Sequence, residues 1–448
     1  MKACLKQYRR QAGQTLIEII ITIGLLAILF HAVFTLITAS FRLLGDSRAR
    51  LTARHIAQAK IEEIRNLPFD DVGTVGGIPP GIITQSETAM RNGLNYVSRT
   101  SVIYIDDEFD KLAPVDLLPI DYKRVRVEVS WSGLFASKRP VVALTDITPR
   151  GIESTTGGGT IRITVFNASV EMLPATEIHI VNPNVNPAID LIIYTNENGQ
   201  VLLPGAPVCA NCYYISATKQ GYTTDRTYSS EEVANPNKAY LTVSEGLVSD
   251  ISFTIDWTST LTIKTFADRD SGFPPLGQAE FHLRGTRRIG TDTEEMPVYL
   301  VDADYTTAET GELVLEDMVW DSYQFTLGNP ALDLAGSNPF VPLGLLPNQE
   351  LNLLVATKAH QDHTLLLSVI DASGSAIASA GAHLTRDGGL DEFLFTGSAE
   401  NPDFGQGFFS ALDIGEYDYE VTASAYQTSS GTIEVDGQSS EIIILQAE

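Results

Sequence analysis

The sequence predicts an α+β N-terminal region, in which one long helix packs on an antiparallel β-meander, followed by three tandem all-β sandwich modules. Three observations predict this class. An uncharged apolar run near the N-terminus changes into an amphipathic helical pattern. After Pro68 the pattern switches to short segments of alternating apolar and polar residues. Beyond residue 159, an arrangement of glycine turns and tyrosines recurs three times.

Length and charge set the outer limits of the interpretation. At 448 residues the chain is too long for one core and is expected to form several domains. The formal charge is −26, and it becomes −30 if four cations near the N-terminus (Lys2, Lys6, Arg9 and Arg10) are removed by processing. A surface this acidic repels phosphate backbones, so we expect no nucleic-acid partner.

The apolar run begins directly after a carboxylate. From Ile19 to Phe41 the 23 residues include no Asp, Glu, Lys or Arg. As a helix they are about 34 Å long, enough to cross the hydrocarbon core of a bilayer. Glu18 lies just inside the apolar segment, where a lone carboxylate costs about 2.5–3.5 kcal/mol. Cleavage after Gly13 would create an α-amino group at Gln14, one helical turn before Glu18, and this amine could neutralise the carboxylate.

These residues carry a family resemblance. The basic leader 1–13 ending in Gly13, the residues 14–18 (Gln-Thr-Leu-Ile-Glu) and the long apolar run resemble the class III leader of type IV prepilins and type II secretion pseudopilins. The resemblance implies cleavage by a prepilin peptidase and N-methylation of Gln14. It also implies that Glu18 is required for assembly with other pilin or pseudopilin subunits on an inner-membrane assembly platform. Gln14 replaces the usual Phe, and the helix lacks a mid-membrane proline, so a minor pilin fits better than a major one.

Two other interpretations of the N-terminus were weighed. An ordinary secretory signal has a shorter apolar region, of about 7–15 residues, with a small-residue cleavage site behind it. A plain single-pass anchor fits the hydrophobicity but leaves Gly13 and Glu18 unexplained. The alternative hypothesis is therefore a membrane-anchored extracellular β-sandwich protein that never enters a filament. In both hypotheses the chain crosses the inner membrane once with its C-terminal modules outside. The pilin hypothesis adds transfer to a pilus or pseudopilus, periplasmic or extracellular.

The remaining chain is divided by changes of pattern. The helix is expected over 14–67, with 19–41 in the membrane or filament core, because Pro68 disfavours helix in the residue before it. A meander (68–152) with strands near 96–104, 122–131 and 140–145 follows, then a linker (153–159) and modules at 160–257, 258–358 and 362–448. The apolar helical positions expected to contact the meander are Leu43, Leu44, Leu51, Ile56, Ala59, Ile61 and Ile64.

Each module contains a tyrosine-bearing strand after a glycine turn. Tyr213 precedes Tyr222 by nine residues, Tyr417 precedes Tyr426 by the same step, and Tyr323 marks the middle copy. The arrangement resembles carboxypeptidase regulatory-like (transthyretin-like) domains and the B-type repeats of surface adhesins. The resemblance implies non-catalytic spacer or binding modules, displayed for adhesion or partner binding.

Candidate chemical sites are few. Beyond an inner membrane, Cys209 and Cys212 are expected to form a disulfide, although free thiols and a metal or redox role stay open. The pair His360 and His363 supplies two of the four ligands of a zinc site, and we expect a polar linker there instead. The acidic loop 106–110 leaves Ca²⁺ binding open. No nucleophile, phosphate-loop or cofactor motif is present, so we expect neither a cofactor nor an enzyme.

Overall fold

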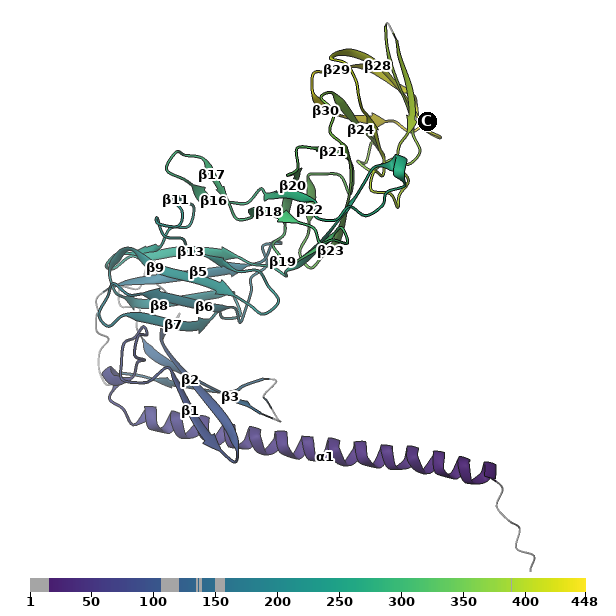
Figure 1. Cartoon of the computed structure of the whole chain (residues 1–448). Helices are drawn as coiled ribbons and strands as arrows, with labels where there is room; N and C mark the ends of the chain where they lie inside the picture. Colours follow the sequence, from purple (N-terminus) through teal and green to yellow (C-terminus); the bar gives the residue numbers. More distant parts are fainter. Residues whose placement is uncertain (1–15, 106–120, 134–135, 137–138, 150–157, 388) are drawn as a thin grey trace, which may run out of the picture. The chain divides into compact units, whose positions relative to one another are not determined.

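The computed structural model describes residues 16–105, 121–133, 136, 139–149, 158–387 and 389–448, with side chains from residue 24 onward. The chain divides into two compact units, Met1–Thr156 with Leu203–Ala206, and Gly157–Leu202 with Pro207–Glu448. The predicted fold class, a long helix and a meander followed by β-sandwich modules, is confirmed (Figure 1).

The first unit consists of one long helix and a four-stranded sheet. Helix α1 (Leu16–Arg65) ends shortly before Pro68, as predicted, and a 3-10 turn, η1 (Phe69–Asp71), follows it. The sheet is an antiparallel meander in the order β1-β2-β3-β4. Its first strand was not predicted. The strands are β1 (Ser86–Arg91), β2 (Leu94–Ile105), β3 (Tyr122–Ser132) and β4 (Val141–Ile147).

The second half of α1 packs on the meander through small residues. Ala49, Ala53 and Ala57 are buried at intervals of four residues, and Ile61 and Ile64 continue the same face. They contact an inner face of the sheet built from Val102, Val125, Val127, Val129, Tyr96 and Trp131. Alanine side chains are small, so they let the helix backbone approach a valine-rich sheet closely.

The predicted contact face of the helix was therefore partly wrong. Leu43, Leu44 and Leu51 are exposed, and Ala59 also faces away from the sheet. The C-terminal part of the predicted stripe contacts the core: Ile61 and Ile64 are buried in it, and the partly buried Ile56 packs against it. The periodic spacing of large leucines led to the prediction that they face the sheet. In the structure, the smaller alanines form the buried face of the helix, because they fit the limited space above the sheet.

The second unit holds three groups of strands with a common plan. We define module 1 as β5 to β13, module 2 as β14 to β23 and module 3 as β24 to β30. In each module the first strand pairs in parallel with the last one: β5 with β13, β14 with β23, and β24 with β30. On its other edge the first strand pairs with the strand that follows the glycine turn: β8, β19 or β27.

A second sheet in each module faces the first. The sheet orders are β10-β9-β6-β7 with β12 beside β9, β18-β15-β20-β22, and β26-β25-β28-β29. Module 1 contains β5 (Gly159–Phe166), β6 (Glu177–Asn182), β7 (Ile189–Tyr194), β8 (Gln200–Ala206), β9 (Cys209–Thr218), β10 (Asp225–Arg226), β11 (Asn235–Pro236), β12 (Leu241–Val243) and β13 (Val248–Thr254).

Module 2 is the most elaborated of the three. It contains β14 (Ser259–Phe266), η2 (Arg269–Ser271), β15 (Glu280–Gly285), β16 (Arg288–Thr291), β17 (Pro297–Tyr299), β18 (Asp302–Thr306), β19 (Glu312–Met318), β20 (Asp321–Leu327), β21 (Leu332–Asn338), β22 (Leu343–Leu345) and β23 (Glu350–Ala359). Module 3 contains β24 (Thr364–Asp371), β25 (Gly381–Arg386), β26 (Leu390–Phe395), β27 (Gln406–Phe409), β28 (Gly415–Thr422), β29 (Ser429–Val435) and β30 (Gln438–Leu445). The predicted module boundaries stay a prediction.

The tyrosines of the sequence repeat have the same role in all three modules. Tyr213, Tyr323 and Tyr417 are almost fully buried. Each hydroxyl donates to a backbone carbonyl a few residues upstream, that of Pro207 (2.6 Å), Val319 (2.6 Å) and Asp413 (2.7 Å) respectively. A buried tyrosine needs such an acceptor, and the bond fixes the corner that leads into its strand.

The glycine turns are equivalent as well. Gly199, Gly311 and Gly405 have φ angles of 67°, 77° and 67°, a region that suits glycine. In each module the glycine carbonyl accepts a 2.8 Å hydrogen bond from the backbone N–H of the first strand, at Val165, Thr265 and Val369. The sequence repeat thus marks two structural features of each module, the tyrosine corner and the glycine turn.

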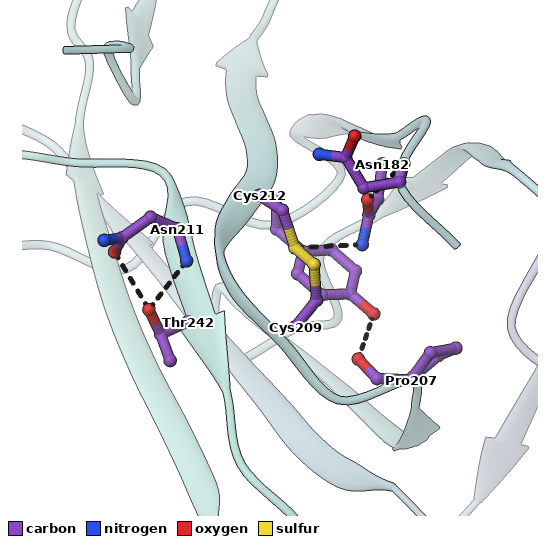
Figure 2. Close-up of a disulfide and its surroundings, with 8 residues drawn as sticks. Asn182, Pro207, Cys209, Asn211, Cys212 and Thr242 are labelled. Carbon is purple, nitrogen blue, oxygen red and sulfur yellow. Dashed lines mark hydrogen bonds between the residues drawn. A yellow bond between two sulfur atoms is a disulfide. The ribbon is translucent and has the colours of Figure 1, made fainter.

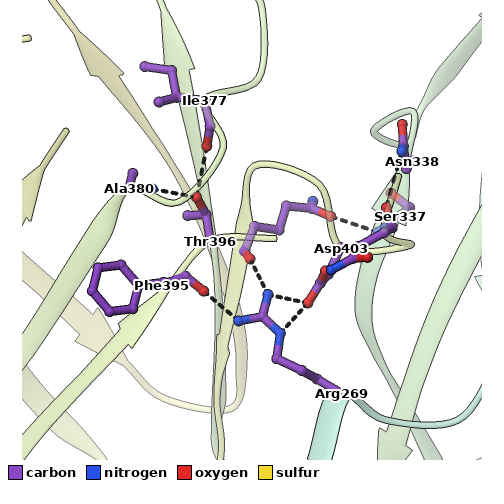
Figure 3. A network of polar contacts seen from close by, with 10 residues as sticks. Arg269, Ser337, Asn338, Ile377, Ala380, Phe395, Thr396 and Asp403 are labelled. Atoms are coloured by element: carbon purple, nitrogen blue, oxygen red, sulfur yellow. Dashed lines mark hydrogen bonds and ion pairs between the residues drawn. The ribbon is translucent and has the colours of Figure 1, made fainter. Parts of the chain in front are cut away.

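Modules 2 and 3 are joined by a buried polar network (Figure 3). Arg269 of η2 donates from Nε to the carboxylate of Asp403 (2.6 Å) and from its other nitrogens to the carbonyls of Phe395 and Gln406. Burial raises the pKa of Asp403, and the Arg269 guanidinium opposes that rise. The Gln406 side chain also accepts from the backbone N–H of Ser337 (2.6 Å). These contacts link η2 and β21 of module 2 to Asp403 and β27 of module 3.

We predict that the alanine contact of α1 tolerates no larger side chain. Ala53→Leu should lower the unfolding free energy of the first unit by about 1–3 kcal/mol, because the added atoms overpack a closed contact. Ala59→Leu, on the exposed side of the same helix, should have little effect. Urea unfolding followed through Trp131 fluorescence, with Trp257 and Trp320 changed to Phe, measures both. Equal effects of the two substitutions would contradict the alanine contact.

Candidate functional site

The first half of α1 is an apolar surface. From Gly24 to Leu44 the helix presents large side chains to the outside, with Ile28 69%, Phe34 66% and Phe41 67% exposed. Among the residues whose side chains are described, Gly24–Arg65 is the helix whose length and composition would allow it to cross a membrane. A contiguous apolar surface of this size is typical of a segment that meets lipid or other helices.

Three hydroxyl groups in this half donate to backbone carbonyls of the helix itself. Thr35 donates to the carbonyl of Ala32 (2.8 Å), and Thr38 donates to that of Phe34 (3.0 Å). Ser40 donates in the same way to the carbonyl of Leu36 (2.9 Å). Because these three hydroxyl groups have partners within the helix, the described part of the segment suits a medium without hydrogen-bonding partners.

The residues with predicted processing and assembly roles lie near the N-terminus in sequence. Gly13 and Gln14 fall outside the described residues. Glu18 is the third residue of α1, which begins at Leu16. The predicted roles of Gly13 and Gln14 in cleavage and methylation, and of Glu18 in assembly, therefore stay predictions.

A buried lysine fixes the end of α1 to the sheet. Lys123, on β3, is only 2% exposed and donates from Nζ to the carbonyl of Phe69 in η1 (2.7 Å). Its ammonium lies over the rings of Phe69 and Tyr104, 4.4 and 5.4 Å from their centroids. Burial lowers the pKa of Lys123 to about 8, against the opposing attraction of Asp70 and Asp71.

Sequence reasoning missed this lysine, although a signal was present. In β3 the residues Val125, Val127 and Val129 point into the core, and Lys123 has the same phase. A lysine at an inward position of an alternating strand is unusual, since lysines are seldom fully buried without a partner. The alternation alone therefore indicates that Lys123 has a special role, and the structure shows that it anchors η1.

Cys209 and Cys212 are joined in a disulfide at the start of β9 (Figure 2). Their Cα atoms are 6.0 Å apart. Cys212 is buried, and its Sγ accepts from Nδ2 of Asn182 (3.2 Å). Between the cysteines, Asn211 exchanges hydrogen bonds with Thr242 of β12. The pair lies next to the Tyr213 corner, so it fixes how the chain enters the central strand of its sheet.

In the part of the chain that the structure describes, the other candidate residues form no metal centre. His360 forms a 2.8 Å contact with the carboxylate of Asp333, which raises the pKa of this histidine, and Gln438 contacts both residues. Within the described ranges, no group of three or more His, Cys, Asp or Glu side chains could hold a metal ion. The acidic loop 106–110 lies outside those ranges.

Comparison with known families identifies the N-terminus. Residues 8–34 match the family model of the prokaryotic N-terminal methylation motif. The match spans the predicted cleavage site, Glu18 and the first part of the apolar run, so the predicted prepilin-type leader is confirmed. No curated protein matches the chain significantly in sequence. The resemblance of the modules to carboxypeptidase regulatory-like domains stays a prediction.

Solved structures with some likeness are known. The Bacillus anthracis TIE protein is 13% identical over 82% of this chain and 73% of its own, with a TM-score of 0.18. The shaft pilin SpaA of Lactobacillus rhamnosus GG is 12% identical over 43% of this chain and 98% of its own, with a TM-score of 0.18. The minor pilin GBS52 of Streptococcus agalactiae is 15% identical over 43% and 97%, with a TM-score of 0.16. TM-scores this low support no conclusion about function.

We predict that the Lys123 anchor makes the first unit more stable as the pH rises. The folded pKa of about 8 lies below the value of about 10.4 of an unfolded lysine. The unfolded chain therefore binds more protons between these values, and the unfolding free energy increases with pH in that window. From pH 7.5 to 9.5 the wild type should gain about 1–2 kcal/mol relative to Lys123→Met. The Trp131 unfolding assay measures the difference, and a difference independent of pH would contradict the buried, proton-releasing lysine.

Proposed function

We propose that this chain, which carries a prepilin-type N-terminal methylation motif, is a minor type IV pilin or pseudopilin. The observation that carries the proposal is the continuity of the motif at 8–34 with an apolar half-helix that has large exposed side chains. In this role the half-helix leaves the inner membrane and packs against the helices of other subunits in a filament core. The β-sandwich modules are then displayed for adhesion or partner binding.

The chemistry at the N-terminus explains how the helix could leave lipid. A prepilin peptidase would cleave after Gly13, and the new amine of Gln14 would be methylated. This amine, one turn from Glu18, would pair with the carboxylate in the same or a neighbouring subunit and offset a cost of about 2.5–3.5 kcal/mol. Glu18 thus serves assembly, with the inner-membrane platform as the site of insertion.

Size favours a minor subunit. The strands of the three modules extend from Gly159 to Leu445, far beyond the meander that packs on α1. Such a bulky addition on every subunit would crowd a filament whose subunits pack through their helices. A place at the tip, or at rare positions in the filament, avoids that crowding. The Cys209–Cys212 bond would be stable in the oxidising compartment in which the modules then lie.

We predict that Glu18→Gln leaves the protein in the membrane but reduces its amount in sheared filaments by at least about tenfold, because the amine loses its partner in an apolar core. Glu62→Gln is the control. Glu62 lies on the same helix and forms an exposed ion pair with Arg65 (3.0 Å). An exposed ion pair contributes little to stability, so incorporation of this variant should stay at the wild-type level. Immunoblots of sheared filaments and membranes measure the distribution.

Two results would contradict the proposal in different ways. Wild-type incorporation of Glu18→Gln would remove the assembly role of this carboxylate. Absence of the wild-type protein itself from filaments, with full retention in the membrane, would favour an anchored extracellular β-sandwich protein instead.

A further inference from the structure

Modules 1 and 2 meet through two insertions that break the common plan. In module 2, the segment between β15 and β18 forms the hairpin β16–β17, whereas β6–β7 and β25–β26 are connected without extra strands. In module 1, the segment between β10 and β12 contains β11. Strands β11 and β16 pair antiparallel, so the two insertions form one sheet, β11-β16-β17.

Side chains strengthen this junction. Asn237 donates from its backbone N–H to the carbonyl of Ile289 (2.8 Å) and from Nδ2 to that of Arg288 (2.9 Å). Gly290 has no room for a side chain, because a Cβ there would lie 2.4 Å from the carbonyl oxygen of Asn235. The hairpin is therefore held at a fixed position against module 1.

A pocket of about 320 Å³ lies at this junction. Module 1 contributes Asn167, Tyr228 and Lys238 to its lining, and module 2 contributes Arg287 and Trp320, among others. The volume is at the lower end of the range of small-molecule sites, which are typically apolar with a few convergent polar groups. The repeated elements of the modules do not account for this pocket, since it depends on insertions present in one module each.

The pocket is lined by basic side chains, although the chain as a whole is acidic. Arg287 lies over the ring of Trp320, with 4.1 Å between its Cζ and the ring centroid, and Arg288 also lines the pocket. In the described part of the chain, neither guanidinium has a carboxylate within ion-pair distance. Asp225, the acidic residue among the lining residues, pairs with Lys238 and accepts from the N–H of Thr254 (2.9 Å). The lining thus includes two arginines that form no ion pair among the described residues, in a chain of charge −26. The Arg288 guanidinium lies 5.8 Å from the ring centroid of Tyr299, and the backbone N–H of Arg287 donates to the carboxylate of Asp321 (2.9 Å).

We propose that this pocket binds a carboxylate-bearing sugar unit, such as a uronic acid residue of an acidic glycan. An arginine stacked on an indole is held in orientation and offers a planar set of donors that matches a carboxylate. The indole of Trp320 supplies apolar surface for a sugar ring, and the exposed Thr224, which also lines the pocket, adds a hydroxyl for hydrogen bonds to the sugar. The role of the site in the cell rests on the proposed display of the modules. Binding of the ligand to the pocket does not depend on that display.

Purified full-length protein in detergent tests the proposal. The probe is a uronic-acid oligosaccharide, followed through Trp320 fluorescence with Trp131 and Trp257 changed to Phe. We expect a saturable change that weakens with added salt. Arg287→Gln and the exposed Arg288→Gln should each weaken binding by about tenfold or more. Arg284→Gln is the matched control, because Arg284 lies on β15 and contacts Gln324 and Tyr299 outside the pocket lining.

The outcomes separate the explanations. Equal binding of the neutral oligosaccharide of the same length, or of inorganic phosphate, would overturn the assignment to a carboxylate sugar. No saturable response of the wild type, or unchanged binding in Arg288→Gln, would overturn the site itself. Circular dichroism and thermal unfolding of each variant identify a loss caused by misfolding, and Arg288→Gln keeps the test decisive if Arg287→Gln does not fold. A negative result in this assay leaves filament incorporation untouched, so the two proposals fail separately.

Discussion

The apolar first half of α1 cannot remain in water, and the rest of the structure depends on this constraint. Burial of one large apolar side chain is worth about 1.5–3 kcal/mol, and many such side chains are exposed between Gly24 and Leu44. The same helix continues without interruption into a half that is covered by its own sheet. One helix is therefore built for two environments, with the change near Ala49, where the alanine contact begins.

The anchored half limits what the exposed half can do. The alanine contact and the Lys123 anchor hold the end of α1 against the meander, so this part of the helix is tied to the folded unit. Because the helix is held against the sheet, the sheet moves together with the apolar half of the helix. Filament assembly through the apolar half would then display folded domains without any rearrangement within the first unit.

The second unit separates repeated features from singular ones. The tyrosine corners and glycine turns occur in all three modules and serve the fold of each. The Arg269–Asp403 network and the β11-β16-β17 sheet occur once each, and both lie where modules meet. Features that are not repeated are better candidates for a specific function than those that every module needs for folding. For this reason, the pocket beside Arg287 is the candidate binding site.

Local chemistry explains what could be predicted from the sequence. Pro68 marks the end of the helix, alternation marks β2 and β3, and Tyr213, Tyr323 and Tyr417 mark a repeat, because each signal lies within a few residues. The contact through Ala49, Ala53 and Ala57 was missed because burial of small residues depends on the distance to the sheet. The β11–β16 pairing and the pocket join residues about 50 positions apart in sequence, at Pro236 and Gly290, and no local pattern specifies such a pairing. The processing roles of Gly13 and Gln14 come from motif resemblance, whereas the need of Glu18 for a partner also follows from the cost of a lone carboxylate in an apolar segment.

The central claim is that proteolysis creates an amine for Glu18 to meet. N-terminal mass spectrometry of the mature protein, isolated from cells that contain the processing peptidase, tests it most directly. The account predicts a chain that begins at Gln14 and carries one methyl group on its α-amine. A chain with an intact Met1, or one that begins after Ser40, would contradict the account.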